Sequence, residues 1–309
     1  MRTIFFALSL VFAFPVFSQS SEEVILVYDS INVSGTLLVP ANLEEMPVAL
    51  IISGSGPTDR NGNNPVMQNN SLKLLAEALA DAGIASLRYD KRGSAASAIP
   101  NASESDVSFE DFISDAEGWI DLLKQDERFN DFVVIGHSEG SLIGMITAQK
   151  SEVSKYVSIA GSGRKANDIL LEQLAQNAPF FTVPATIMLD SLANGYTVSN
   201  VLPALKEMFR PSVQPFLISW FKYDPAVEIA KLNKPVLILQ GTTDIQVLVS
   251  DAELLAAAKE DAKLVIFEGM NHVLKEAPID RGANIETYNN PDLKLFNGFA
   301  KEIIDFIQN

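Results

Sequence analysis

The chain has 309 residues, 47% of them hydrophobic, and 23 basic against 39 acidic side chains give a formal charge of −16 at pH 7. A surface this acidic argues against nucleic acid and anionic membranes as partners. The chain has no cysteine, which excludes disulfides and thiol nucleophiles, so the fold must depend on an apolar core.

Residues 1–18, MRTIFFALSLVFAFPVFS, are predicted to be a cleaved secretory signal peptide. Arg2 precedes an apolar stretch, and compact residues follow at Val16 and Ser18. The stretch is short for a membrane span; an uncleaved anchor is the alternative. Removal of Arg2 leaves 22 of the 23 basic side chains against 39 acidic ones, a charge of −17. We expect an exported protein, periplasmic or secreted, without stable membrane association after cleavage.

The mature chain is expected to begin with an antiparallel hairpin and to continue as a parallel sheet. The hairpin comprises residues 24–28 and 31–39. Apolar runs then alternate with segments of helical periodicity. The predicted strands are 48–52, 84–89, 132–135, 156–160, 236–240 and 264–267, and the predicted helices are 72–81, 109–124, 142–150, 252–259 and 293–307. Apolar strands separated by helices indicate an α/β fold with both sheet faces covered.

The alternation stops between residues 161 and 225. Four helical segments, ILLEQLAQ, ATIMLDSLA, VLPALKEMF and QPFLISWF, take the place of strands and are separated by prolines. This part is predicted to be a helical cap, inserted after the sixth strand and lying over the carboxyl edge of the sheet. Helices that pack away from any site are the alternative. The core would then comprise residues 19–160 and 226–309.

The segment DFVVIGHSEGSLIG, residues 131–144, ends an apolar strand in a tight turn and opens a helix. Such a turn requires small residues two positions before and after its serine, and Gly136 and Gly140 meet that requirement. The serine is then raised above the sheet edge at a helix N-terminus, where backbone N–H groups can receive an oxyanion. Ser138 is therefore predicted to be a nucleophile, with a serine in an ordinary turn as the alternative.

A serine hydroxyl needs a base to take its proton, and the chain has two histidines. His137 adjoins Ser138 in a sharp turn, where neighbouring side chains diverge, so it is poorly placed. His272 follows the last predicted strand, at the edge where Ser138 is expected. His272 is therefore predicted to be the base.

The imidazole in turn needs a carboxylate to orient it. Asp244 follows the predicted strand PVLILQ at the same edge, and it completes the nucleophile, acid, base order of α/β-hydrolases. Among its rivals, Asp251 is expected to cap a helix N-terminus and Asp261 lies at the opposite end of the last strand. Glu268 is the strongest competitor.

Three motifs together resemble the α/β-hydrolase superfamily: GHSEG (136–140), QGTTDIQV (240–247) and GMNH (269–272). The strings ISGSGPTDRNGN (52–63) and RYDKRGSAAS (88–97) resemble, more narrowly, capped bacterial serine esterases of the EstD type, a group also described as peptidases. The likeness extends over the mature chain. It implies an α/β-hydrolase fold, with a mostly parallel central sheet, an N-terminal antiparallel hairpin and an inserted helical cap. It implies no metal or organic cofactor.

An oxyanion hole needs two N–H donors. Glu139, the residue after the nucleophile, is expected to supply one, and the loop of residues 53–57 after the third strand the other. By analogy with the family the second donor is Ser55, with Gly56 as its rival and a flexible turn as the alternative. Ser53 stands where many relatives have histidine, which puts the bracing role of that position in doubt.

Arg60 and the cluster of residues 90–92 are expected to form a buried ion network that braces loops at the site edge, in preference to binding substrate. The whole pattern predicts a serine carboxylesterase for short to medium acyl or aryl esters. An aminopeptidase or acyl-peptide hydrolase is the first alternative, and a non-catalytic binding protein with the same fold is the second. The sequence leaves the oligomeric state open.

Overall fold

The computed structural model describes residues 19–28, 31–41, 43–98, 103–150 and 152–309, and the predicted signal peptide lies outside them. The described residues form one sheet of eight strands. The strands are β1 (Gln19–Tyr28), β2 (Ile31–Pro40), β3 (Met46–Ile52), β4 (Ala85–Tyr89), β5 (Phe129–His137), β6 (Lys155–Ile159), β7 (Val236–Gly241) and β8 (Lys263–Phe267). Their spatial order is β1-β2-β4-β3-β5-β6-β7-β8.

The strand directions follow the prediction of a hairpin joined to a parallel sheet. β1 pairs with β2 and β2 pairs with β4 in antiparallel register, whereas every pair from β4 and β3 to β7 and β8 is parallel. The carboxyl ends of β3 to β8 therefore meet at one edge. The fold class predicted from the sequence is confirmed.

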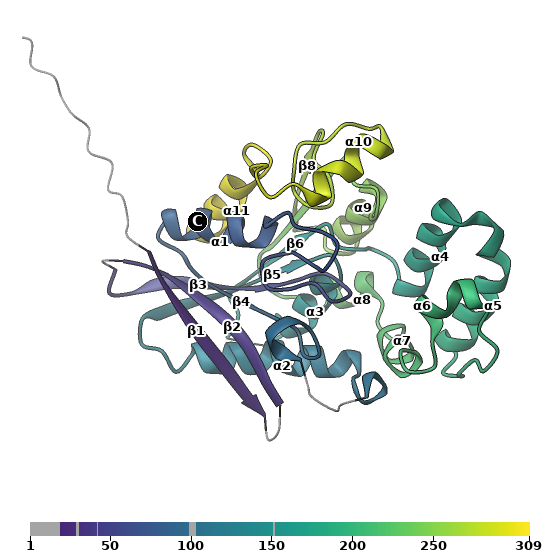
Figure 1. Cartoon of the computed structure of the whole chain (residues 1–309). Helices are drawn as coiled ribbons and strands as arrows, with labels where there is room; N and C mark the ends of the chain where they lie inside the picture. Colours follow the sequence, from purple (N-terminus) through teal and green to yellow (C-terminus); the bar gives the residue numbers. More distant parts are fainter. Residues whose placement is uncertain (1–18, 29–30, 42, 99–102, 151) are drawn as a thin grey trace, which may run out of the picture.

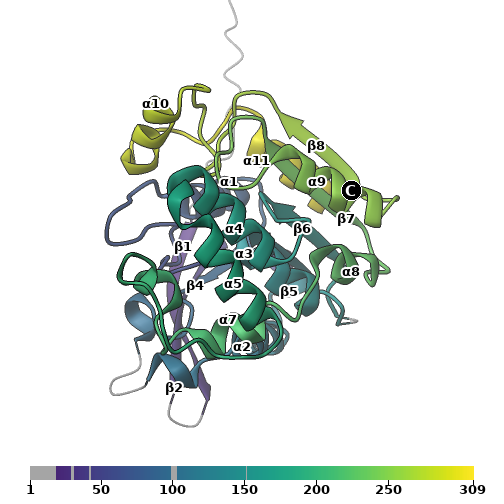
Figure 2. The ribbon, with the colours of Figure 1, turned by 90° about the vertical axis from the view of Figure 1, so that its right-hand side faces the viewer.

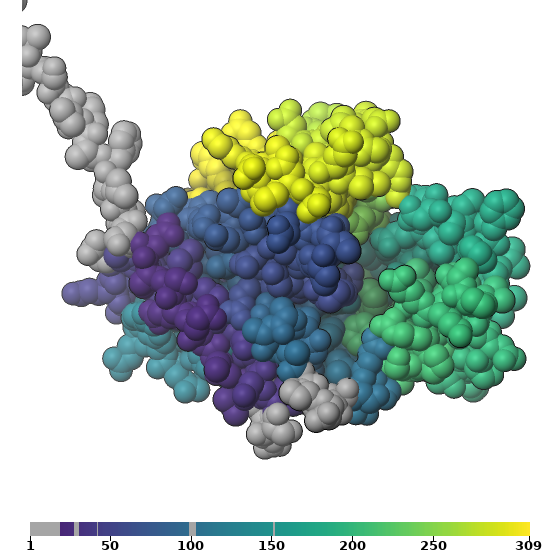
Figure 3. Space-filling view, viewed as in Figure 1, coloured from purple at the N-terminus to yellow at the C-terminus, as the bar shows by residue number. Residues whose placement is uncertain are grey.

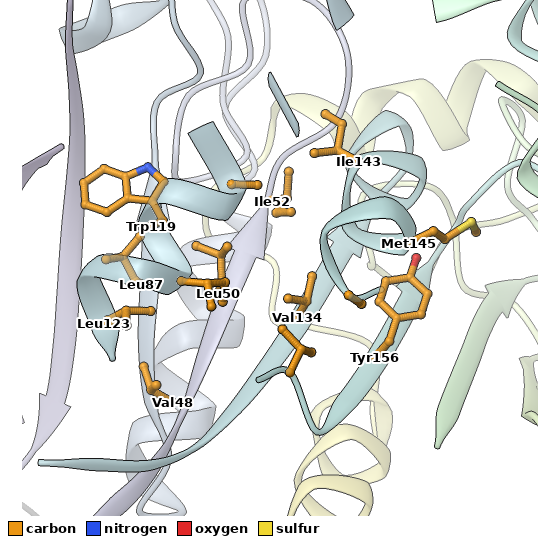
Figure 4. Packing of buried hydrophobic residues seen from close by; sticks show 14 of the residues in the cluster. Val48, Leu50, Ile52, Leu87, Trp119, Leu123, Val134, Ile143, Met145 and Tyr156 are labelled. Atoms are coloured by element: carbon orange, nitrogen blue, oxygen red, sulfur yellow. The ribbon is translucent and has the colours of Figure 1, made fainter. Parts of the chain in front are cut away.

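Helices cover both faces of the sheet because its strands are apolar on both sides (Figure 1). The covering helices are α1 (Ser71–Asp81), α2 (Phe109–Leu123), α3 (Glu139–Thr147), α9 (Val249–Ala258) and α11 (Phe299–Gln308). Val48, Leu50 and Ile52 of β3 point towards α2 and α3, in a cluster that contains Trp119 (Figure 4), and the two residues between them point towards α1 and α11.

Between β6 and β7 the described chain forms helices and no strand. These helices are α4 (Ala166–Asn177), α5 (Thr182–Ala193), α6 (Lys206–Phe209), α7 (Gln214–Trp220) and α8 (Pro225–Ala230), with 3₁₀ turns at Pro179–Phe181 and Pro203–Leu205. We call α4 to α7 the helical lobe. It has its own buried cluster around Leu189, Leu192 and Phe209. The lobe stands beside the body in Figure 3, and α4 and α5 lie in front of α3 in Figure 2.

Several predicted elements differ from those observed. The last helix begins at Phe299 instead of residue 293, since Gly298 adopts φ 83° and breaks the helical path before it. The sequence did not indicate α8 or α10 (Arg281–Glu286), which are each only six residues long. The prediction that Asp251 caps a helix is wrong, because α9 begins at Val249 and Asp251 lies inside its first turn.

Two further 3₁₀ turns, Ala95–Ser97 and Glu104–Asp106, lie between β4 and α2, and a third, Thr287–Asn289, follows α10. None of the helices in the described ranges combines the length and the apolar character needed to cross a bilayer.

Candidate active site

Ser138 lies in a turn between β5 and α3 that requires the two neighbouring glycines. Its backbone adopts φ 55° and ψ −121°, a strained conformation for a residue with a side chain. A Cβ on Gly136 would lie 2.2 Å from the carbonyl oxygen of Gly140, and one on Gly140 would lie 2.3 Å from that of Ile52. The N–H of Ser138 donates to the Ile159 carbonyl at 2.9 Å, which ties the turn to β6.

Asp244 and His272 meet at the same edge, as predicted from their positions after β7 and β8. Nδ1 of His272 lies 2.8 Å from Oδ2 of Asp244, and both side chains are buried. An ionised carboxylate only accepts, so Nδ1 carries the proton and Nε2 keeps a free lone pair when the ring is neutral. The rival Glu268 is exposed and has no contact with this imidazole among the described residues.

The Asp244 carboxylate is held by donors on both oxygens. Oδ1 accepts the backbone N–H groups of Gln246 at 2.7 Å and Val247 at 3.0 Å, and Oδ2 also accepts from the side chain of Gln240 at 3.1 Å. Burial by itself would raise the pKa of Asp244, but the imidazole and the backbone donors outweigh burial and hold that pKa below its usual range. The acid therefore stays ionised and keeps one orientation.

The loop that carries His272 is positioned by glycine and by buried amides. Gly241 ends β7 so close to this loop that a Cβ there would lie 2.0 Å from the Met270 carbonyl oxygen. Asn271 donates to Asn284 of α10 at 3.2 Å, and Asn284 donates to the Thr243 carbonyl at 2.8 Å. The short helix α10, which the sequence did not reveal, thus braces the loop.

His137 lies beside His272, a position that the sequence reasoning missed. The two ring centroids are 4.8 Å apart, and Nε2 of His137 donates to the His272 carbonyl at 2.9 Å. Burial, together with the neighbouring imidazole of His272, lowers the pKa of His137 to about 3, so this ring is neutral at ordinary pH. His137 therefore links the turn of Ser138 to the loop of His272.

The turn of Ser138 and the loop of His272 are joined through His137. The described residues include no hydrogen bond between the Ser138 hydroxyl and the His272 imidazole. The link runs through the main chain, since His137 precedes Ser138 and binds the residue that carries the imidazole. Catalytic hydrogen bonds are often loose before substrate binds.

The two expected oxyanion donors, Ser55 and Glu139, line one small cavity with Ser138. Within the described ranges, neither backbone N–H donates to a protein acceptor, and the same holds for Gly56. Ser53 is buried, and its hydroxyl has one weak bond, to the Thr58 carbonyl at 3.4 Å. Two free N–H groups at a nucleophile are what an oxyanion hole needs.

The predicted ion network is present, and it is divided into separate pairs. Arg60 binds Asp90 at 2.9 Å and Glu23 at 2.7 Å. Lys91 points elsewhere, to Glu139 at 2.5 Å. Arg92 binds Asp115 of α2 at 2.5 Å and Asp111 at 3.1 Å. Each of these guanidinium and ammonium groups is paired with a carboxylate of the protein. This pairing agrees with the prediction that the basic residues brace loops at the site edge in preference to binding substrate.

Two cavities share part of their lining next to the turn of Ser138, and Ser138 itself lines the smaller one. The smaller, of about 70 Å³, extends from Ser138 beneath α4 to the loop after β7. The larger, of about 530 Å³, runs between the loop after β4 and α7 of the helical lobe. Ser55, Glu139 and Trp220 line both. In the described part of the chain, no group of three or more His, Asp or Glu side chains could hold a metal ion.

The chain is similar in sequence to known hydrolases. A family model described as "Serine aminopeptidase, S33" matches residues 68–204. Esterase EstD from Thermotoga maritima is 25% identical over 265 residues, which cover 80% of this chain and 60% of EstD. The chain thus spans about three fifths of that relative.

Solved structures show the same fold. Est1E from Butyrivibrio proteoclasticus with ferulic acid bound has a TM-score of 0.61 at 16% identity, covering 93% of this chain and 100% of that one. The Pyrococcus furiosus esterase Pf2001 has a TM-score of 0.60 at 16% identity, covering 94% of this chain and 91% of that one. The resemblance to the α/β-hydrolase superfamily that the sequence predicts is confirmed.

The tight turn at Ser138 leaves no room for a side chain at Gly140. Gly140→Ala places a methyl group against the Ile52 carbonyl, so we expect the free energy of unfolding to fall by on the order of 3 kcal/mol. Gly282→Ala is the control, since an added Cβ on exposed α10 meets nothing closer than 3.4 Å. Urea denaturation of both variants measures the difference. Equal stability of the two would contradict the close approach.

The buried, neutral His137 makes the stability of the fold depend on pH. Because its pKa is lowered to about 3 in the fold, the unfolded chain takes up the proton first as pH falls. Between pH 7 and pH 5 the folded state should lose about 2 kcal/mol through this group, at about 1.4 kcal/mol per pH unit below pH 6.5.

His137→Gln keeps a donor for the His272 carbonyl but does not titrate, so its unfolding free energy should decline less between these two pH values. Urea denaturation of both proteins at pH 7 and pH 5 gives the comparison. The same decline in both would show that His137 is protonated in the folded protein.

Proposed function

Since the chain has the α/β-hydrolase fold, we propose that it is a serine hydrolase that cleaves carboxylic esters. The observation that carries this proposal is the buried pair of His272 and Asp244, 2.8 Å apart, beside the strained turn of Ser138. The esterase names of EstD, Est1E and Pf2001 support the same class. No metal or organic cofactor enters the proposal.

In the proposed mechanism, Ser138 Oγ attacks the ester carbonyl while Nε2 of His272 takes its proton. The resulting imidazolium is stabilised by the ionised Asp244. The N–H groups of Glu139 and Ser55 bind the oxyanion, with Gly56 as the alternative to Ser55. His272 then passes the proton to the departing alcohol, and water hydrolyses the acyl-enzyme by the same steps in reverse.

The two cavities support an ester with one compact and one larger apolar part. The smaller cavity, about 70 Å³, has room for only a few heavy atoms, whereas the larger holds about 530 Å³. Phe112, Phe216 and Trp220 line the larger one and offer aromatic faces. Aryl esters fit this lining, and ferulic acid, the compound bound in the Est1E structure, is an aromatic acid.

The family description "Serine aminopeptidase, S33" makes an aminopeptidase the second candidate. An aminopeptidase must bind the free ammonium group of its substrate, usually with a carboxylate. Glu139 and Glu104 are the acids that line the two cavities, among the described residues. Glu139 pairs with Lys91, and Glu104 pairs with Arg210. Because both carboxylates are occupied, the ester is the better fit.

We propose in addition that the chain is exported. The support is the pattern of residues 1–18, with Arg2 before an apolar stretch. The helical lobe is proposed as a cap over the site, because α4 and α7 contribute residues to the two cavities. Fractionation of expressing cells should find a shortened protein outside the cytoplasm; a full-length protein in the cytoplasm would refute export.

Replacement of the nucleophile tests the activity. Ser138→Ala should lower p-nitrophenyl acetate hydrolysis by at least about 10³-fold and leave the unfolding transition in place, since the alanine methyl still fits the turn. The wild type should also turn over p-nitrophenyl esters faster than aminoacyl p-nitroanilides. Faster anilide turnover would favour the aminopeptidase. No turnover of either substrate would favour the non-catalytic binding protein.

A further inference from the structure

Lys91 is a buried lysine that joins the two loops of the proposed oxyanion hole. Its side chain is 2% exposed. Nζ donates to the Gly54 carbonyl at 2.7 Å and to Oε1 of Glu139 at 2.5 Å, and it lies 5.0 Å from the centre of the Phe112 ring. We propose that Lys91 is a positioning residue that sets the directions of both oxyanion donors. This inference rests on the proposed function.

Lys91 acts on the first donor, the Ser55 N–H, through the geometry of one peptide bond. The Gly54 carbonyl and the Ser55 N–H belong to the same peptide unit. That unit is trans, like every peptide bond in the described ranges, so its C=O and N–H point in opposite directions. Because the Gly54 carbonyl points towards Lys91, the Ser55 N–H must point away from Lys91.

The residue whose carbonyl Lys91 holds, Gly54, lies against the nucleophile. A Cβ placed on Gly54 would lie 3.2 Å from Cβ and 3.6 Å from Oγ of Ser138. Ser55 itself lines the cavity at Ser138. Ser55 is favoured over Gly56 as the second donor, because Ser55 lines the cavity at Ser138 whereas Gly56 lines only the larger of the two cavities. The carbonyl of the next peptide unit, that of Ser55, accepts the neutral hydroxyl of Thr58 at 2.9 Å in place of a buried ammonium.

The other donor is the N–H of Glu139. Glu139 is the first residue of α3, and its side chain is 3% exposed. Among the described residues Lys91 is the partner of this carboxylate, and a buried charge that loses its partner is strongly disfavoured. By pairing with it, the ammonium fixes the first turn of α3, and with it the direction of the N–H after the nucleophile.

The ammonium also acts on the electrostatics of the hole. A charged donor polarises the carbonyl that accepts from it, which makes the N–H of the same peptide a stronger donor. Direct contact of Lys91 with a substrate is disfavoured, since its three donors face Gly54, Glu139 and the ring of Phe112 and its side chain is nearly inaccessible. Lys91 thus acts through the two backbone N–H groups.

The test compares Lys91→Met with a matched control. Lys234 also donates to two backbone carbonyls, those of Lys150 and Val153 at 2.5 Å each, but it lies before β7 at the opposite end of the strand from the site. Lys91→Met should lower kcat for p-nitrophenyl acetate by about 10²-fold, the loss expected for one oxyanion donor, with KM changed less than about threefold. Lys234→Met should change neither.

A pair of inhibitors separates positioning from general damage. The carbonyl carbon of a trifluoromethyl ketone is attacked by Ser138 Oγ, and the resulting hemiketal carries an oxyanion. The matching methyl ketone binds mainly as the unreacted carbonyl, which resembles the ground state. In Lys91→Met the affinity for the trifluoromethyl ketone should fall by the same factor as kcat, and the affinity for the methyl ketone should stay within about threefold. If Lys91→Met does not fold, Lys91→Gln replaces it, with an expected loss of about tenfold on the trifluoromethyl ketone alone.

Three results overturn the proposal. Unchanged kcat and unchanged trifluoromethyl ketone affinity in the folded variant would show that Lys91 sets neither donor. Equal losses on both ketones, or a raised KM at unchanged kcat, would assign Lys91 to substrate binding or to general folding. A wild type that hydrolyses no ester overturns the proposed function and this inference together, whereas the first two results, with an active wild type, overturn the inference alone.

Discussion

The site depends on a close approach of three backbone segments at one point. β3, β5 and the first turn of α3 meet where Gly136 and Gly140 stand, at separations that leave no room for a Cβ. This contact holds Ser138 at a positive φ of 55° and places it at the carboxyl edge of the sheet. The parallel sheet then brings the loops after β3, β4, β7 and β8 to the same edge, and each of these loops contributes one part of the site.

Buried charged side chains at that edge of the described structure are paired with opposite charges or with hydrogen-bonding groups. Asp244 has donors on both oxygens, and the pairs of Arg60 with Asp90 and of Lys91 with Glu139 join loops that are distant in the sequence. Buried pairs of this kind contribute little net stability but penalise every arrangement in which one partner is missing. They therefore select a single loop geometry, as a preorganised site requires.

The sequence predicted the sheet, its order of strands and helices, and the residues at the edge, because each depends on a local pattern. The glycine spacing indicated the turn of Ser138, and the positions of Asp244 and His272 after apolar strands indicated their convergence. Side-chain partners that depend on packing were less accessible: the bond of His137 to the His272 carbonyl and the bracing of Asn271 by Asn284 have no local signal. The short helix α10 escaped detection for the same reason.

The most direct test of the account is covalent labelling with a fluorophosphonate, followed by mass spectrometry of the modified peptide. One adduct is expected, on Ser138, with a much slower reaction after His272→Ala, because only a serine activated by a neighbouring base attacks the reagent quickly. An unlabelled protein, an adduct on another residue, or the same labelling rate without His272 would contradict the convergence of these side chains into a catalytic site.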